Sequence, residues 1–452
     1  MTARRAAILA FLLVGLAAQL TAGGRATRTA SITADEPFYL LTTQSLLSDG
    51  DLDLNDEYDN DEMDRFWDGS VPLWRQMVPM DDGRLLSPHD PGVSLLTLPA
   101  YAVAGLDGVQ RFLALLWAVT MAAATLLAIR FGASPRAALV AAVAIGAGPP
   151  GVVYASQVYP EAPAALGVAI GLLAATSPRA HPLIVAGCAA ALPWLGSKYA
   201  LLSLIVFGVF AWRHRRDRRA LVLAAAPAAL LAGHYVWWHL HTFGGLTPYS
   251  TNVVYAGNDS LTIVNLHVNQ GGRSYRLYGL FLDARFGLFR WLPIAPLALW
   301  GITRKTLLPA AVVASTVLVG TFVSITMMGW WFPGRMLVAG LPALTVLVAL
   351  GAARFPKTAV ALAAWGIAIA AVTAWSAHHH GIRLAVDPWT VGGPLAWHQL
   401  FPDFRAFGAP QILRSLAWGI ALAIARSIAV NGKAPPPRRQ LARLPGLLRP
   451  AD

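Results

Sequence analysis

Long apolar blocks recur from one end of the chain to the other. Blocks such as "AVALAAWGIAIAAV" at 359–372 have no polar face, so they do not fit the water-exposed helices of a soluble bundle. About 20 apolar residues in a helix span the hydrocarbon core of a bilayer, and a helix satisfies its own backbone hydrogen bonds there. The pattern therefore predicts an all-α polytopic membrane protein.

The boundaries of the apolar blocks predict about twelve spans. We expect them near 6–22, 109–130, 137–153, 162–176, 182–194, 198–212, 219–238, 282–301, 307–328, 334–352, 358–376 and 411–430. The hairpin over 182–212 is short for two spans. The block 93–106 is short and contains Pro99, so it is either an interfacial or re-entrant helix or a thirteenth span.

The positions of the basic residues indicate how the chain is oriented in the membrane, and they do not indicate a polyanionic partner. The chain has 35 Lys+Arg against 23 Asp+Glu, a net charge of +12. The basic residues gather at the ends of apolar blocks: Arg4/Arg5, Arg130/Arg136, 213–219, Arg304/Lys305, Arg354/Lys357 and the tail from Lys433. Twelve crossings from a cytoplasmic N-terminus put all of these clusters on the cytoplasmic side, as the positive-inside rule requires. We therefore expect a multi-pass plasma-membrane protein and no nucleic-acid partner.

The same orientation divides the chain into a membrane domain and outer connections. Residues 1–430 form the predicted transmembrane domain, and 431–452 form a basic cytoplasmic tail. The first block fits a cleaved signal peptide as well as a span, and the later topology favours a span. The outer connections are 23–92, 154–161, 239–281 and 377–410, and fifteen of the 23 acids lie within 31–90. The single cysteine, Cys188, excludes an intrachain disulfide.

Residues 49–64, "DGDLDLNDEYDNDEMD", are the most acidic stretch, with nine acids in sixteen positions. The spacing of Asp51, Asp53 and Glu62 resembles the ligands of an EF-hand loop, but Asp56 stands where that loop needs glycine. Two interpretations stay open: a looser site for Ca²⁺, Mg²⁺ or Mn²⁺, and a solvated spacer.

The motif "TADEPFY" follows the first predicted span. Asp35 and Glu36 repel each other, which can raise the pKa of one carboxyl and suit it to accept a proton. Capping of the next helix is the alternative role for these acids. Pro37 begins that helix, which its apolar residues predict to lie on the membrane surface.

Other polar residues fall at the outer ends of spans. A charged side chain at membrane depth costs free energy, so its presence there indicates a functional role. Anchoring at the membrane interface is the alternative explanation for each of these residues taken alone. These residues are Tyr159, Glu161, Lys198, Asp283, Arg285, Arg290 and Arg335. Together they offer cations for a phosphate and carboxylates for a proton. The chain has no P-loop or dinucleotide fingerprint, so a cytosolic nucleotide is not implied.

Five short motifs together resemble the GT-C superfamily of membrane glycosyltransferases, in the branch of protein O-mannosyltransferases and aminoarabinose transferases. They are "DEPFY" after the first span, "SPHDPG" at 87–92, "YASQVYPE" at 154–161, "LDARFGLF" at 282–289 and "WWFPGR" at 330–335. They occur in the expected order and cover most of the chain. The segment "SPHDPG" departs from the pattern, since it carries His89 and Asp90 where relatives place a basic residue.

The resemblance implies inverting transfer of a sugar from a polyprenyl-phosphate lipid to a glycan, lipid or protein hydroxyl on the extracytoplasmic face. It makes Asp35 the general base and Glu36 its neighbour. The implied donor-phosphate ligands are Lys198, Arg335, Arg285 and His89, and the implied substrate contacts are Glu161, Tyr159, Tyr39 and Asp283. No cofactor is required, and dependence on Mg²⁺, Mn²⁺ or Ca²⁺ stays open. The alternative functions are a transporter or flippase for a lipid-linked or cationic substrate, and a scaffold; a missing internal repeat weighs against a duplicated transporter.

Overall fold

The protein folds almost entirely into helices. A computed structural model describes residues 1–431 apart from 71, 74, 251–252, 256–258, 262–270, 325, 380–383, 386–392 and 407. It is 71% helical with almost no sheet, which confirms the all-α prediction. In the described residues, the strands form two antiparallel hairpins: β1 (Val78–Pro79) with β2 (Leu85–Leu86), and β3 (Val253–Tyr255) with β4 (Asp259–Leu261). The predicted tail over 432–452 lies outside the described residues.

The helices fall into long apolar ones and short connecting ones. The long helices are α1 (Ala3–Thr21), α2 (Glu36–Ser48), α4 (Gly92–Arg130), α5 (Pro135–Gly146), α7 (Glu161–Ala175), α8 (Pro182–Leu195), α9 (Ala200–Arg213), α10 (Arg218–Phe243), α15 (Leu307–Leu318), α16 (Leu341–Ala352), α17 (Pro356–His378) and α18 (Ala409–Asn431). The short α-helices are α3 (Asn55–Asp59), α6 (Gly151–Tyr154), α12 (Arg276–Leu282), α13 (Leu288–Trp291) and α14 (Ala298–Gly301). Short 3₁₀ helices include η2 (Ser197–Tyr199) and η9 (Arg335–Gly340).

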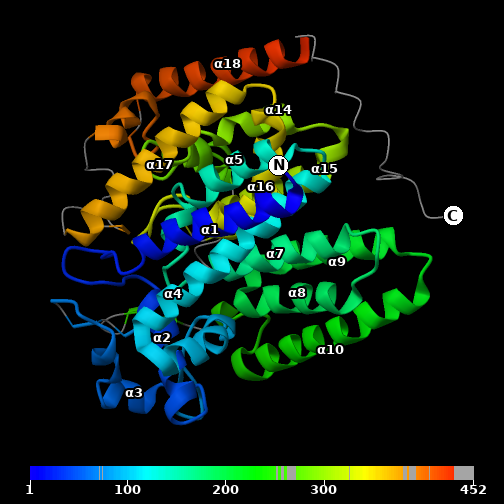
Figure 1. Ribbon diagram of the computed structural model, residues 1–452. Helices are drawn as coiled ribbons and strands as arrows, with labels where there is room; N and C mark the ends of the chain where they lie inside the picture. The colour runs from blue at the N-terminus through cyan, green and yellow to red at the C-terminus, as the bar shows by residue number, and fades with distance from the viewer. Residues whose placement is uncertain are drawn as a thin grey trace.

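Six of the described helical segments are long and apolar enough to cross a membrane: Ala3–Thr21, Gly92–Arg130, Arg218–Ser250, Arg304–Val323, Arg335–Ala352 and Pro356–His378. Their apolar windows differ in burial, from 89% for Arg335–Ala352 to 17% for Arg218–Ser250. Figure 1 shows the same difference in burial: α16 lies inside the helical body and α10 lies along one edge. An exposed apolar helix such as α10 is stable in lipid and not in water, which fits a polytopic membrane protein.

The block 93–106 is helical and continues into the predicted span 109–130. Together they form α4, which is kinked where Ala104 and Gly105 leave helical geometry. Gly105 has φ 55°, a value that glycine adopts without the steric cost of a Cβ. The sequence did not decide whether block 93–106 is an interfacial or re-entrant helix or a separate span. In the structure it is the first part of a bent helix that continues into 109–130.

The predicted span 282–301 is wrong as a single helix. The helix α12 ends at Leu282, and the Asp283 carboxylate accepts the backbone N–H groups of Arg285 and Phe286 at 2.9 and 2.8 Å. Pro293 and Pro296 remove two further donors, so the segment folds as the short turns α13 and α14.

The predicted surface helix after Pro37 exists as α2, but it does not lie open on a surface. Every residue from Glu36 to Ser45 is buried. It packs against α4, where the Ser94 hydroxyl donates to the Tyr39 carbonyl at 2.8 Å, and the folded acidic loop covers it from the other side. Figure 1 shows α2 and α3 together at one end of the helical body.

Candidate functional site

Two acids and two bases form a continuous chain of ion pairs. Arg335 donates from Nη2 to Asp35 at 2.8 Å and from Nε to Glu161 at 2.9 Å. Lys198 Nζ donates to the same Glu161 oxygen at 2.7 Å. We call Asp35, Glu161, Lys198 and Arg335 the charged cluster. The two negative and two positive charges of the cluster cancel, which offsets part of the cost of burying ionised groups.

Each member of the charged cluster comes from a different part of the chain. Asp35 precedes α2, Glu161 begins α7, Lys198 lies in η2 between α8 and α9, and Arg335 begins η9. All four sit at helix ends, where the chain changes direction and a side chain can leave the packed body. The structure thus joins residues up to 300 positions apart.

The backbone before Arg335 has a shape that only glycine fits. Gly334 has φ +83°, and a Cβ there would lie 2.9 Å from Cγ of Pro150. Nearby, the Tyr154 hydroxyl donates to the Phe332 carbonyl at 2.6 Å and fixes the same turn. These contacts set the direction in which the Arg335 guanidinium leaves the chain.

Aromatic rings complete the environment of Arg335. Its guanidinium lies 4.1 Å from the centroid of the Tyr159 ring and 4.9 Å from that of Trp331. A cation between ring faces is stabilised by their quadrupoles, most strongly where water is excluded. Tyr159 therefore contacts the charged cluster through its ring, and its hydroxyl donates to the Thr33 carbonyl at 3.3 Å.

Exposure divides the charged cluster into a buried centre and open ends. Arg335 and Glu161 are 6% and 1% exposed, whereas Asp35 and Lys198 are 23% and 26% exposed. Burial raises the pKa of Asp35, but the charge and hydrogen bond of Arg335 and the charge of Lys198 outweigh it, and the net shift is downward. Asp35 is therefore an ionised, accessible carboxylate at neutral pH.

Glu36 differs from its neighbour in environment. It is buried, and its two oxygens accept the backbone N–H groups of Thr33 at 3.2 Å and Val158 at 2.9 Å. Burial raises its pKa to about 8 despite these bonds. Glu36 thus joins the segment before α2 to the segment before α7, which is a positioning role.

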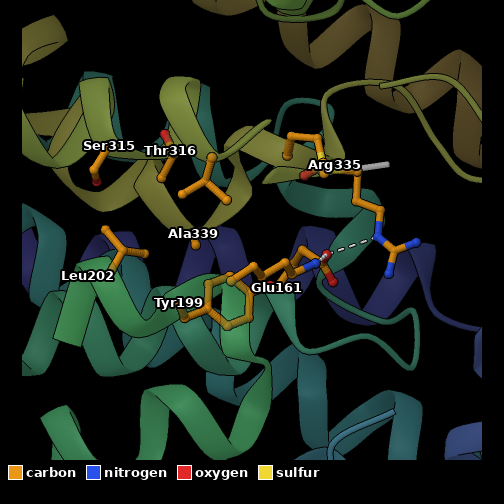
Figure 2. Close-up of a pocket in the computed structure, with 11 residues that line it drawn as sticks. Glu161, Tyr199, Leu202, Ser315, Thr316, Arg335 and Ala339 are labelled. Carbon is orange, nitrogen blue, oxygen red and sulfur yellow. Dashed lines mark hydrogen bonds and ion pairs between the residues drawn. The ribbon is translucent and has the colours of Figure 1, made fainter. Parts of the chain in front are cut away.

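A narrow pocket of about 20 Å³, with room for about one water molecule, lies beside the cations of the charged cluster. Figure 2 shows Arg335 and Glu161 at one side, with Tyr199, Leu202 and Ala339 along the walls and Ser315 and Thr316 beyond them. The walls are mainly apolar away from the charges. The second oxygen of Glu161 and the Tyr199 hydroxyl are buried, and neither has a hydrogen-bond partner elsewhere among the described residues. The pocket thus places two cations beside apolar side chains, in a space that holds little more than one water molecule.

The segment "SPHDPG" lies next to the charged cluster. The His89 ring stacks on Tyr39 at 4.7 Å between centroids, and its Nε2 lies 3.4 Å from the Gln76 side-chain oxygen. Burial lowers the pKa of His89, so it is a neutral hydrogen-bonding group at pH 7 rather than a cation. This makes it a weaker phosphate ligand than we expected.

Asp90 is a positioning residue that the sequence did not single out. Its carboxylate accepts the Ser197 backbone N–H at 3.1 Å and lies 2.8 Å from Nε2 of the buried His239. Ser197 immediately precedes Lys198, so Asp90 fixes the turn that carries this cation. The sequence feature that could have identified Asp90 is its position in a proline-flanked motif beside the membrane.

Asp283, Arg285 and Arg290 are placed apart from the charged cluster. Asp283 also accepts the Phe404 N–H at 3.1 Å, and Arg285 lies 3.7 Å from the Asp403 carboxylate. The two arginines line a second pocket of about 290 Å³. Neither Asp283 nor Arg285 lines the pocket beside the charged cluster, and their assignment to the same site as Asp35 stays a prediction.

The predicted metal ligands Asp51, Asp53 and Glu62 do not converge. Asp51 accepts the Ser45 hydroxyl at 3.2 Å, Asp53 accepts the Leu85 N–H at 2.9 Å, and Glu62 pairs with Arg65. Each carboxylate is occupied locally, in bonds that close turns within the acidic loop. Among the described residues, Asp49, Asp56 and Glu57 of the same loop come together instead.

Comparisons of the chain with protein families, curated proteins and solved structures found no match.

Proposed function

We propose that the protein is a glycosyltransferase of the GT-C type. It moves a sugar from a polyprenyl-phosphate lipid to the hydroxyl of a glycan, lipid or protein acceptor. In this proposal the chain crosses the plasma membrane about twelve or thirteen times and carries the charged cluster at the extracytoplasmic face of the cell envelope.

The observation that carries the proposal is the meeting of an accessible carboxylate, two cations and an apolar-walled pocket. Lys198 and Arg335 line the pocket, and Asp35 pairs with the same arginine. A phosphate linked to an isoprenoid has matching chemistry, since its anionic group suits the two cations and its chain suits apolar side chains such as Leu202 and Ala339 beside them.

The reaction follows from these groups. The Asp35 carboxylate takes the proton of the acceptor hydroxyl as that oxygen attacks the anomeric carbon of the donor. The bond from this carbon to the phosphate oxygen breaks, its electron pair leaves with the polyprenyl phosphate, and attack from the opposite face inverts the centre. Lys198 and Arg335 stabilise the charge that develops on the leaving phosphate. Glu161 orients both cations and can accept a substrate hydroxyl at its second oxygen.

A donor panel tests the proposal. The purified full-length protein is incubated with envelope extract and polyprenyl-phosphate donors that carry different labelled sugars. The expected result is release of polyprenyl phosphate together with labelled product from at least one donor. If the same donors instead cross a proteoliposome bilayer unchanged, the protein is a transporter and the proposal is wrong.

A further inference from the structure

The acidic loop brings three carboxylates together at the end of α2 farthest from Asp35. Asp49 caps the C-terminus of α2, and Asp56 and Glu57 lie in the first turn of α3. One oxygen from each of the three lies within 4.8 Å of the others. Two helices thus present three acids to one point.

Glu57 makes this more than an exposed acidic cluster. The residue is 1% exposed, and both of its carboxylate oxygens are buried with no hydrogen-bond partner among the described residues. A buried carboxylate without a partner is strongly unfavourable. Asp56 cannot compensate it, because two ionised carboxylates are both acceptors, and only a proton or a cation between them removes the conflict.

We propose that Asp49, Asp56 and Glu57 bind one calcium ion, which links the C-terminus of α2 to α3. Carboxylate oxygens are the ligands of hard cations, and calcium–oxygen distances of about 2.3–2.6 Å allow two ligands to be about 5 Å apart at most. The observed separation fits within this limit. Magnesium requires shorter distances and near-octahedral geometry, so the wider and less regular calcium sphere suits this trio better.

The surroundings favour a cation as well. The site lies at the C-terminus of α2, where the helix dipole places partial negative charge. The Ser48 hydroxyl donates to one oxygen of Asp49 at 2.7 Å and leaves the other oxygen for the ion.

Bound calcium would stabilise the helix that begins directly after Asp35. It would close the loop between α2 and α3 without touching the charged cluster, so this proposal is independent of sugar transfer. Its readouts are ion binding and thermal stability, neither of which needs a substrate.

The test is a calcium titration of the full-length protein in detergent after removal of metals with a chelator. Isothermal calorimetry should show one saturable site with a dissociation constant on the order of 1 mM or tighter. Calcium should also raise the apparent melting midpoint. Glu57→Gln should weaken binding at least about tenfold, because it removes one of three ligand charges.

Two further variants decide the outcome. Asp49→Asn changes an exposed residue, so it should leave the fold intact and still weaken calcium binding, even if Glu57→Gln fails to fold. Asp59→Asn is the matched control, an exposed acid of the same run outside the trio, and it should bind like the wild type. Absence of saturable binding, unchanged binding in Asp49→Asn, or an equal loss in Asp59→Asn would each overturn the proposal.

Discussion

Arg335 is the residue on which the charged cluster depends. It contacts two carboxylates and two aromatic rings while 6% exposed. Loss of its charge leaves Glu161 with Lys198 alone and Asp35 with no direct cation. Removing one partner of a buried ion pair destabilises the fold by far more than the intact pair stabilises it, because the remaining charge stays desolvated.

Arg335→Met should therefore reduce both stability and transfer. The expected loss is about 3–5 kcal/mol of folding free energy, measured as a lowered denaturation midpoint in detergent. Arg84→Met is the control, because Arg84 forms an exposed pair with Asp82 and its removal should cost less than about 1 kcal/mol. Equal effects of the two substitutions would contradict the central role of Arg335.

Glu36 should make stability depend on pH in a specific direction. Its pKa is about 8 in the folded protein against an ordinary value of 4.5, so the folded state binds the proton more tightly. This contribution is complete below pH 4.5 and is lost as pH rises through 8. The apparent melting midpoint should fall between about pH 6 and pH 9, and Glu36→Gln should flatten that dependence. An identical slope in the variant would show that Glu36 is not the group responsible.

At the scale of elements, turns position the site more than helices do. Gly334 and Pro150 meet where two elements far apart in the sequence cross, and Arg335 follows directly. The requirement at Gly334 combines positive φ with close packing, and either alone disfavours a larger residue.

Gly334→Ala should lower stability by about 1–3 kcal/mol and reduce transfer by more than its effect on folding explains. Gly105→Ala is the comparison, because Gly105 also has positive φ but a Cβ there would meet nothing within 4 Å. Chemical denaturation and donor turnover of both variants measure the two effects. Retained turnover in Gly334→Ala would separate this turn from the site.

The sequence predicted the elements that local pattern determines. Apolar blocks identified most helices, because a lipid-facing helix must be apolar along its length. It failed over 282–301, where the Asp283 side chain takes backbone donors away from a helix, and over 49–64, where spacing alone suggested Asp51, Asp53 and Glu62. Which carboxylates converge depends on how α2 and α3 pack, which spacing does not encode.

The sequence predicted which residues belong to the charged cluster but not how they are arranged in space. Asp35, Glu161, Lys198 and Arg335 all stood at the ends of apolar blocks. Arg285 stood in an equivalent position, and nothing local distinguishes it. The structure separates them because tertiary packing brings the turn before Arg335 to α7 and sends Arg285 toward Asp403.

At the scale of the whole molecule, the basic clusters predict which ends of the helices face the cytoplasm. In a Cys188→Ser background, a cysteine introduced by Asp59→Cys should react with an impermeant maleimide added outside intact cells. One introduced by Arg216→Cys should react only after permeabilisation, because the positive-inside rule predicts that the basic connection 213–219 faces the cytoplasm. The reverse labelling would invert the orientation and remove the charged cluster from the outer face.

The most direct test of the central claim is sugar transfer by Asp35→Asn beside Asp82→Asn. Both substitutions remove one carboxylate charge from the same loop, but Asp82 is exposed and lies outside the charged cluster. We predict that Asp35→Asn lowers the rate of polyprenyl-phosphate release about 10²–10⁴-fold, as loss of a general base does, while donor binding changes little. The melting midpoint should fall less than in Arg335→Met, because Arg335 keeps its pair with Glu161. Asp82→Asn should keep the wild-type rate. Transfer by Asp35→Asn at the wild-type rate would contradict the account.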